Sequence, residues 1–216
     1  MDETTEYYQR RAAEYDRIYS LPEWQADLAV LHDLVAEFAT GRRVLEAACG
    51  TGYWTERLAR TAAHVCAVDV NMATLAVART RTYPPATVTF VQADVYRPLP
   101  LATRFDAAFA GLWLSHVDVT RMPAFLDTFH AALTPGSRVM LFDERQTDTR
   151  AGATARIDEA GNRYEKRKLT NGSRFDILKN WYDRTTLRDL FADRGDHFWY
   201  RELTRFWICG YTTRTN

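Results

Sequence analysis

The fold is decided by the stretch VLEAACGTG at residues 44–52. Its apolar start predicts a buried strand, its two glycines predict a loop, and a helix is expected to begin at about Trp54. Glycines let a ligand approach the backbone closely, and a helix N-terminus offers free N–H groups. Glu46, at the carboxyl end of the strand, would repel a pyrophosphate but suits a ligand with an ammonium group. The stretch therefore predicts a site for a ligand that carries an ammonium and a carboxylate.

Short apolar segments alternate with amphipathic segments beyond this loop. Helices are expected from Met72 and over 123–133. Such alternation predicts β-α-β crossovers and a parallel sheet covered on both faces. The strands expected after the first are HVCAVDV (64–70), TVTFVQAD (87–94), RFDAAFAGLWL (104–114) and SRVMLFDE (137–144).

The two ends of the chain depart from this alternation. Residues 3–38 predict two helices that are broken at Pro22, and the polar stretch 145–163 predicts irregular structure. Asn171-Gly172 lies between two alternating segments and predicts a hairpin over 163–178. A helix over 184–193 and one or two strands within 198–213 complete the chain. Without repeats or linkers, residues 1–216 are expected to form one domain.

Composition excludes several classes of function. Lys plus Arg and Asp plus Glu both number 28, so the net charge of zero gives no general attraction to nucleic acid. No apolar run reaches the roughly 20 residues that span a bilayer, and the polar N-terminus is no secretory signal. The three cysteines have no metal-type spacing. We therefore expect a cytoplasmic protein with reduced thiols, no metal, and neither nucleic acid nor membrane as a partner.

Two further acids follow two of the later strands. Asp69 lies 23 residues after Glu46, at a separation where an acid accepts the hydroxyls of a ribose. Asp94 ends the next strand, where its carboxylate suits the exocyclic amine of adenine while Val95 packs on the ring. Because the carboxyl ends of parallel strands share one edge, the three acids are expected in one site.

The run VLEAACGTGYWT resembles the glycine-rich first motif of the class I S-adenosylmethionine-dependent methyltransferases. The resemblance continues through Asp69, VQAD, FDAAFAGLWLSHV and LTPGSRVMLFDE, and covers roughly residues 7–145. YYQRRAAEYDRIY at 7–19 resembles the lid helix of small-molecule members, the methyltransferase type 11/12-like group. The resemblance implies a three-layer Rossmann-like α/β fold, whose seven-stranded, mostly parallel sheet ends in an antiparallel hairpin. Within the single domain it implies a helical lid over 1–40, a cofactor-binding core over 41–145, and a hairpin insertion with the end of the sheet over 146–216.

The same resemblance implies the cofactor S-adenosylmethionine, its product S-adenosylhomocysteine, and the residues that hold them. Many members have a glycine where this chain has Ala48 or Cys49, and substitutions there are common. The methionine end is assigned to the first loop and to a backbone carbonyl after the fourth strand, and the nucleoside end to the second and third strand ends. The residues implied for the methionine end are Glu46, Ala48, Gly50 and Gly52, with Ala110 or Gly111. Those implied for the nucleoside end are Asp69, Asn71, Met72, Asp94 and Val95.

His116 is the candidate catalytic base, since it follows the fourth strand at the edge where open α/β sheets bind ligands. The alternative is that it orients the acceptor without taking a proton. Tyr8, Arg11, Tyr15 and Tyr19 fall on one helix face, which either closes over the cofactor or packs on the sheet. In the first case Tyr19, the second candidate catalytic residue, or Tyr8 lies near the sulfonium, and Arg11 lies near the methionine carboxylate.

The acceptor pocket is predicted from aromatic and polar residues near the later strand ends. Its candidate residues are Trp113, Asp143, Asn180 and Trp181. The basic residues of the hairpin are interpreted as a solvated face, with attraction of an anionic substrate as the alternative. The hairpin itself is the candidate contact of a homodimer.

These features together predict methyl transfer by in-line displacement to an oxygen of a small molecule, as in bacterial secondary metabolism. N-methylation of a heterocycle is the alternative. A nucleic-acid or protein methyltransferase and a non-catalytic cofactor-binding protein are further alternatives. A nicotinamide-dependent dehydrogenase fits less well, because Thr55 stands where its third glycine would be.

Overall fold

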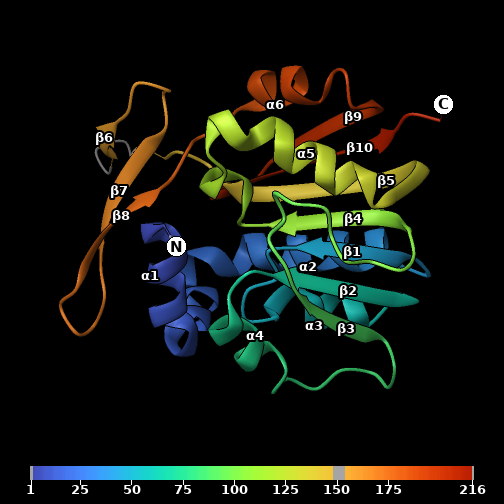
Figure 1. Ribbon diagram of the computed structural model, residues 1–216, viewed down its shortest axis with the longest axis horizontal. Coiled ribbons are helices and arrows are strands. Elements are labelled where there is room, and N and C mark those ends of the chain that lie inside the picture. The colour runs from blue at the N-terminus through green and yellow to red at the C-terminus, as the bar shows by residue number, and fades with distance from the viewer. Residues whose placement is uncertain (1, 148–153, 216) are drawn as a thin grey trace.

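The computed structural model describes residues 2–147 and 154–215. A seven-stranded sheet with the order β3-β2-β1-β4-β5-β10-β9 forms its centre (Figure 1). The first five strands are parallel, and β10 runs antiparallel to both β5 and β9. The predicted fold class is therefore confirmed. The strands are β1 (Arg43–Ala47), β2 (His64–Asp69), β3 (Val88–Gln92), β4 (Phe105–Gly111), β5 (Leu133–Glu144), β9 (Gly195–Glu202) and β10 (Phe206–Thr213).

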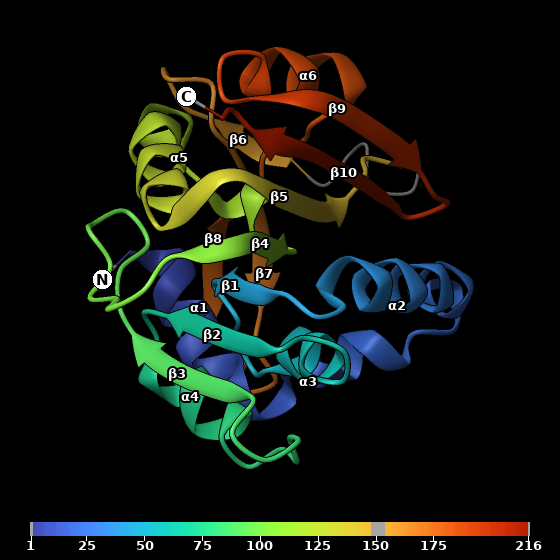
Figure 2. The same ribbon diagram turned by 90° about the vertical axis from the view of Figure 1, so that its right-hand side faces the viewer.

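Helices cover both faces of this sheet (Figure 2). Alternate side chains of β1 enter opposite cores, because successive residues of a strand point to opposite faces. Val44 packs in the core beneath α2, α3 and α4, whereas Leu45 packs in the core beneath α5 and α6. The helices are α1 (Glu3–Arg11), α2 (Gln25–Ala39), α3 (Tyr53–Ala59), α4 (Met72–Ala78), α5 (Met122–Ala131) and α6 (Arg184–Phe191).

The N-terminal segment is less regular than its pattern predicts. The α-helix ends at Arg11, and the chain continues as 3-10 helix over Ala12–Ser20 and Pro22–Trp24. The polar stretch after β5 was expected to be irregular, and this prediction is wrong in part, because β6 spans Thr154–Ile157. Residues 148–153 of that stretch lie outside the described residues.

A second, three-stranded sheet lies beside α1 (Figure 1). It consists of β6, β7 (Arg163–Lys168) and β8 (Arg174–Leu178), all antiparallel. The predicted hairpin is its β7–β8 pair. Tyr7 of α1 packs with Phe175 and Ile177 of β8, so one face of the hairpin is buried against the lid segment. Within the described ranges, none of the helices has the length and hydropathy that crossing a bilayer requires.

Candidate active site

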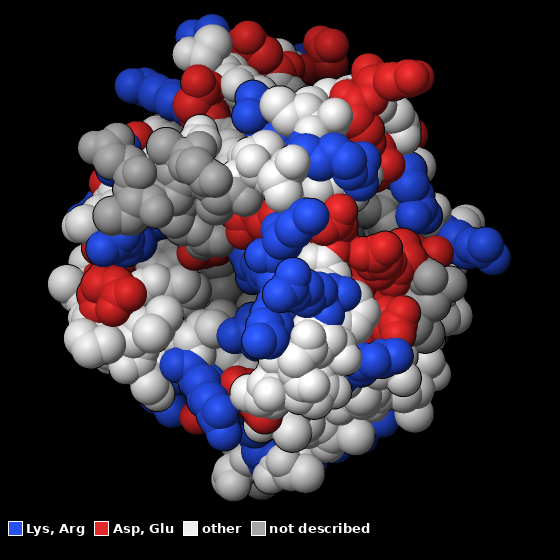
Figure 3. All heavy atoms as spheres, turned by 90° about the vertical axis from the view of Figure 1, so that its left-hand side faces the viewer, with Lys and Arg blue, Asp and Glu red and all other residues white. Residues whose placement is uncertain are grey.

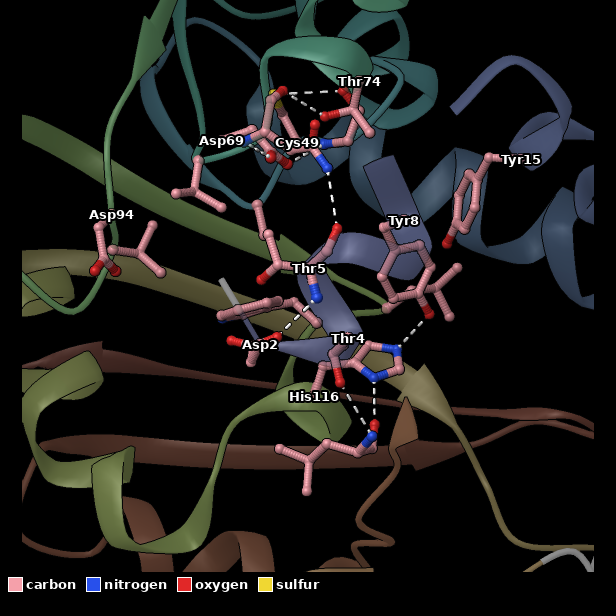
Figure 4. A pocket seen from close by; sticks show the side chains of 18 of the residues that line it. Asp2, Thr4, Thr5, Tyr8, Tyr15, Cys49, Asp69, Thr74, Asp94 and His116 are labelled. Atoms are coloured by element: carbon pink, nitrogen blue, oxygen red, sulfur yellow. Dashed lines mark hydrogen bonds between the residues drawn. The ribbon is translucent and has the colours of Figure 1, made fainter. Parts of the chain in front are cut away.

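A cavity of about 590 Å³ lies beyond the carboxyl ends of β1, β2 and β4. This volume falls within the roughly 300–1,000 Å³ that is usual for small-molecule sites. Asp2, which caps α1, and Thr5 in the first turn of that helix lie across it, between the Asp69 side and the His116 side (Figure 4). Of the residues predicted to bind the cofactor, nine line this cavity: Tyr8, Glu46, Ala48, Gly50, Asp69, Asn71, Asp94, Val95 and Gly111.

The loop after β1 has the conformation that its glycines predict. Gly50 and Gly52 adopt φ of 55° and 77°, and Ala48 adopts φ of 52° although it has a side chain. A Cβ at Gly52 would lie 2.9 Å from the Ala78 Cβ, so Gly52 allows α4 to pack closely. It does not line the cavity. The close approach that was predicted between Gly52 and a ligand is made instead to a helix.

Glu46 is the most buried of the three predicted acids, with 1% of its surface exposed. Its Oε2 accepts a 2.6 Å hydrogen bond from Thr55 Oγ1. Burial raises the pKa of Glu46 from its ordinary 4.5 to about 8, and the nearby Asp69 carboxylate adds to the rise. A carboxyl group with these properties is neutral at pH 7 until a cation is placed beside it.

Asp69 fastens the first loop to the second strand. Its Oδ2 accepts from the Gly50 N–H and its Oδ1 from the Asn71 N–H, both at 2.8 Å. Burial raises the pKa of Asp69, while these N–H groups oppose the rise. Asn71 caps α4 by accepting from Ala73 N, and its Nδ2 donates to the Thr5 carbonyl at 3.3 Å. The ribose-side residues therefore also hold the start of α1.

Asp94 lies at the opposite side of the cavity from Tyr8, as Figure 4 shows. Its Oδ1 accepts from Tyr96 N at 2.9 Å, and its Oδ2 lies 3.7 Å from Arg97 Nε. One third of the side chain is exposed, so a carboxylate oxygen remains accessible to a ligand. Val95 is buried beside it and lines the same cavity.

His116 and Tyr8 form a hydrogen-bonded pair on the lower side of the cavity in Figure 4. His116 Nδ1 lies 2.5 Å from the Leu178 carbonyl oxygen, and Nε2 lies 2.9 Å from Tyr8 Oη. A carbonyl oxygen only accepts, so Nδ1 carries the proton and the lone pair of Nε2 accepts from the Tyr8 hydroxyl. Burial, followed by the nearby Lys179 ammonium, lowers the pKa of His116 to about 3. The ring is therefore neutral and presents a hydrogen-bond acceptor.

Tyr15 and Tyr19 continue the wall that Tyr8 begins. The Tyr8 and Tyr15 ring centres are 5.6 Å apart, and those of Tyr15 and Tyr19 are 6.0 Å apart. Tyr19 also stacks on Tyr53 with ring centres 3.5 Å apart. Burial raises the pKa of Tyr15 and of Tyr19 far above the ordinary value. Both tyrosines line the cavity as neutral phenols, and Tyr19 is no source of a phenolate base.

Three other residues predicted to bind the cofactor do not line the cavity. Arg11 donates to Tyr7 Oη at 3.0 Å and lies over the Tyr15 ring, so it supports the wall from behind. Met72 is 51% exposed on the outside of α4. Ala110 points into the core beneath α5, and Gly111 lines the cavity instead.

The predicted acceptor residues are divided by the structure. Trp113 lines the cavity, but Asp143, Asn180 and Trp181 do not. Asp143 is fully buried in an ion pair with Lys179, at 3.0 Å. Asn180 accepts from Arg163 N and donates to the Val117 carbonyl. These polar groups join β7 to the turn that carries His116 and so have a structural role. A position at the end of a strand does not by itself distinguish such a role from ligand binding.

Several lining residues were missed because they come from segments far apart in the chain. They include residues near the start of α1 and of the second sheet, which no local motif marks. Lys and Arg side chains gather beside a hollow on the face that this sheet covers (Figure 3). The missed polar residues that line the cavity are Asp2, Thr4, Thr5, Thr51, Asp118, Arg121, Arg156, Tyr164 and Asp176.

Among the described residues there is no group of three or more His, Cys, Asp or Glu side chains that could hold a metal ion. All three cysteines are unpaired and buried.

Comparison with known proteins shows which chains have a similar sequence and fold. Residues 44–136 match a family model described as a methyltransferase domain. No curated protein matches the chain. The solved DhpI–SAH complex is 28% identical, with a TM-score of 0.80 over 99% of this chain and 97% of that chain. The DhpI–SAM–HEP complex has the same identity and TM-score over 96% and 95%.

A more distant structure shows the same fold. The N-methyltransferase NodS from Bradyrhizobium japonicum WM9, in complex with S-adenosylhomocysteine, is 16% identical with a TM-score of 0.68, over 98% of this chain and 99% of that chain. Residues 44–136 thus match a methyltransferase domain, and the strand order of the whole chain is shared with methyltransferase structures solved with S-adenosylmethionine or S-adenosylhomocysteine bound.

Proposed function

We propose that the protein transfers the methyl group of S-adenosylmethionine to an oxygen atom of a small molecule. One observation carries the proposal: a single cavity has three acids and a glycine-rich loop on one side and a neutral His116–Tyr8 pair on another. The first set suits the cofactor, and the second suits an acceptor hydroxyl.

The residues of the first set fit the cofactor by their chemistry. Glu46 is a buried carboxyl with a raised pKa, and an ammonium beside it would restore its charge. The loop from Ala48 to Gly50 offers backbone N–H groups to the carboxylate of the amino acid. Asp69 has carboxylate lone pairs for ribose hydroxyls, and Asp94 with Val95 suits adenine. When bound, the cofactor supplies an electrophilic methyl group on its sulfonium.

The His116–Tyr8 pair serves the acceptor. A hydroxyl that donates to Tyr8 Oη, or to His116 Nε2 once Tyr8 moves, keeps a lone pair free for attack. Because the pKa of His116 is about 3, the ring orients the acceptor by a hydrogen bond, and the hydroxyl proton that is released as the O–CH3 bond forms and the S–CH3 bond breaks passes on to water and does not stay on the ring at neutral pH. Of the two roles predicted for His116, we therefore favour orientation, and positioning itself lowers much of the barrier.

The division of the chain into a lid (1–40), a core (41–145) and a hairpin part (146–216) stays part of this proposal. It is supported by Asp2, Thr4 and Thr5, which line the cavity at the start of α1. Leu178 N in β8 donates to Thr4 Oγ1, so the hairpin part holds the lid in place. Movement of α1 would open a path for both ligands.

Calorimetric titration with S-adenosylhomocysteine tests the proposal first, with a nicotinamide dinucleotide as the control ligand. We expect binding of the former in the micromolar range and none of the latter. Screening with methyl-labelled S-adenosylmethionine against phenols, hydroxy acids and heterocyclic amines then identifies the methylated atom. If the labelled methyl group is found on a nitrogen atom, the N-methylation alternative is correct. If S-adenosylhomocysteine does not bind, the cofactor assignment is refuted.

A further inference from the structure

A buried lysine lies directly behind the proposed acceptor end of the cavity. Lys179 follows β8, has 1% of its side chain exposed, and does not line the cavity. Its Nζ lies 3.0 Å from Asp143 Oδ1, 3.0 Å from Glu144 Oε2 and 2.9 Å from Ser115 Oγ. An ammonium has three N–H donors, so these three oxygens use all of them.

The same groups fix the short turn that carries His116. Asp143 Oδ2 accepts from Ser115 N at 3.0 Å, and the Ser115 carbonyl accepts from Asn180 N at 2.8 Å. Lys179 therefore links the end of β5 to the Leu114–His116 turn. Its two neighbours in the chain, Leu178 and Asn180, form hydrogen bonds to that turn directly. The Leu178 carbonyl holds the Nδ1 proton of His116, and Asn180 holds Ser115.

The charges around the His116 ring favour its neutral form. Lys179 is the largest electrostatic influence after burial, and it lowers the pKa of His116. Arg167 on β7 acts in the same direction, whereas Asp143 opposes both. Arg167 is itself paired with Glu165 at 3.0 Å. The groups that face the ring or its lysine are Tyr8 from α1, Asp143 and Glu144 from β5, Arg167 from β7, and Leu178 and Lys179 from the end of β8.

We propose that Lys179 is a positioning residue for His116: through its hydrogen bonds to Ser115 and Asp143 it holds the turn from which Nε2 faces the cavity. The inference rests on the proposed function in one point only, namely that the methyl acceptor forms a hydrogen bond with Nε2. An uncharged ring accepts a hydrogen bond from the acceptor or from Tyr8, whereas a protonated ring would donate and take up the lone pair that methyl transfer needs. Lys179 thus extends the neutral form of His116 to acidic pH.

The test compares Lys179→Gln with the wild type by NMR of the histidine ring nitrogens between pH 5 and 8, with His116→Gln to assign the signal. The wild-type ring should stay neutral with the proton on Nδ1 throughout this range. In Lys179→Gln, which keeps donors for Asp143 and Ser115, the His116 pKa should rise from about 3 into the titrated range, so that the ring begins to take up a proton toward pH 5. The exposed Lys166→Met is the matched control, and its His116 should behave as in the wild type.

A second variant covers the case in which the glutamine variant fails to fold. Lys179→Met combined with Asp143→Asn leaves no unpaired charge at Asp143 and keeps an oxygen for Ser115 N. Because Lys179 influences His116 more than Asp143 does, the His116 pKa should rise in this variant too. In the presence of a methyl acceptor, the methyl-transfer rate of the wild type should show no loss from protonation of His116 between pH 8 and pH 5. The rate of either variant should fall toward pH 5.

Binding of S-adenosylhomocysteine separates the two levels of the proposal. Lys179 lies outside the cavity, so both variants should bind this ligand as the wild type does. If they bind it and the His116 pKa and pH profile do not move, the positioning role of Lys179 is refuted. If the wild type itself fails to bind it, the proposed function fails, while the effect of Lys179 on His116 can still be measured.

Discussion

Replacing Glu46 by Gln should make the ligand-free protein more stable at neutral and alkaline pH. In the folded protein the carboxyl group is 1% exposed and its pKa is about 8, against an ordinary 4.5. Between these two values the folded state holds a proton that the unfolded state has released, so stability falls as pH rises. Gln resembles the protonated carboxyl and can still accept from Thr55, but it has no proton to lose.

The magnitude follows from the size of the shift. A rise of 3.5 units, from 4.5 to about 8, corresponds to about 5 kcal/mol of lost stability above pH 8, at about 1.4 kcal/mol per unit. At pH 7 the unfolded state is 2.5 units past its pKa, so the penalty is about 3 kcal/mol. For a domain of this size 1 kcal/mol moves Tm by roughly 2–4 °C. The Tm of Glu46→Gln should therefore exceed that of the wild type by on the order of 10 °C at pH 8.5.

Thermal denaturation from pH 4.5 to 8.5 measures this difference, with the exposed Glu37→Gln as the control. The two Tm curves should meet near pH 4.5 and separate as the pH rises. Saturating S-adenosylhomocysteine should raise the Tm of the wild type far more than that of the variant, since only the wild type offers the ammonium a carboxylate. Equal pH dependence in the wild type and Glu46→Gln would refute both the burial argument and the assignment of Glu46.

The remaining predictions concern the cofactor, the acceptor and the buried ion pair. The affinity of the wild type for S-adenosylhomocysteine should rise by up to about tenfold per pH unit toward pH 8 and then level off, because the bound ammonium requires ionised Glu46; a flat calorimetric profile would contradict this. Asp69→Asn should weaken that affinity by about 1–3 kcal/mol, measured by the same titration, with Asp33→Asn as an exposed control. His116→Gln should leave the affinity unchanged and lower turnover by about 10²-fold, and full turnover would exclude the orienting role. Asp143→Ala should cost up to about 3–5 kcal/mol in urea unfolding, because it removes one of the two carboxylates that pair with the buried Lys179, yet it should spare ligand binding by the folded fraction; the exposed Asp193→Ala should change neither stability nor binding.

The fold was predictable because its signals are local and repeated. The buried strand at 44–47, the glycines after it and the later β-α alternation each indicate a parallel sheet, and they agree with one another. Two departures come from tertiary structure. The segment after Arg11 is drawn into 3-10 helix where it passes over the loop, with Asp16 accepting from Thr51 Oγ1 at 2.5 Å. The polar Thr154–Ile157 becomes a strand because β7 offers it an edge.

The cofactor side of the site was predictable for a similar reason. Glu46, Asp69 and Asp94 each stand at or just beyond a strand end, and parallel strands bring such ends to one edge. Met72 and Ala110 show the limit of this reasoning, since each is adjacent to a lining residue, Asn71 or Gly111, and faces the other way. Sequence spacing gives the edge of the sheet, but the direction of each side chain decides which residues meet a ligand.

The acceptor side was predicted poorly because binding and structural roles use the same residue types there. Asp143 ends β5 at the right edge, but its position beside Lys179 is created by β8, which follows more than 30 residues later in the chain. A strand-end carboxylate without such a cation would have to face the cavity or lose its charge, as Glu46 does. The contrast between these two acids is thus set by one buried ammonium. It pairs with Asp143, which does not line the cavity, and through Ser115 it holds the turn from which His116 faces the cavity.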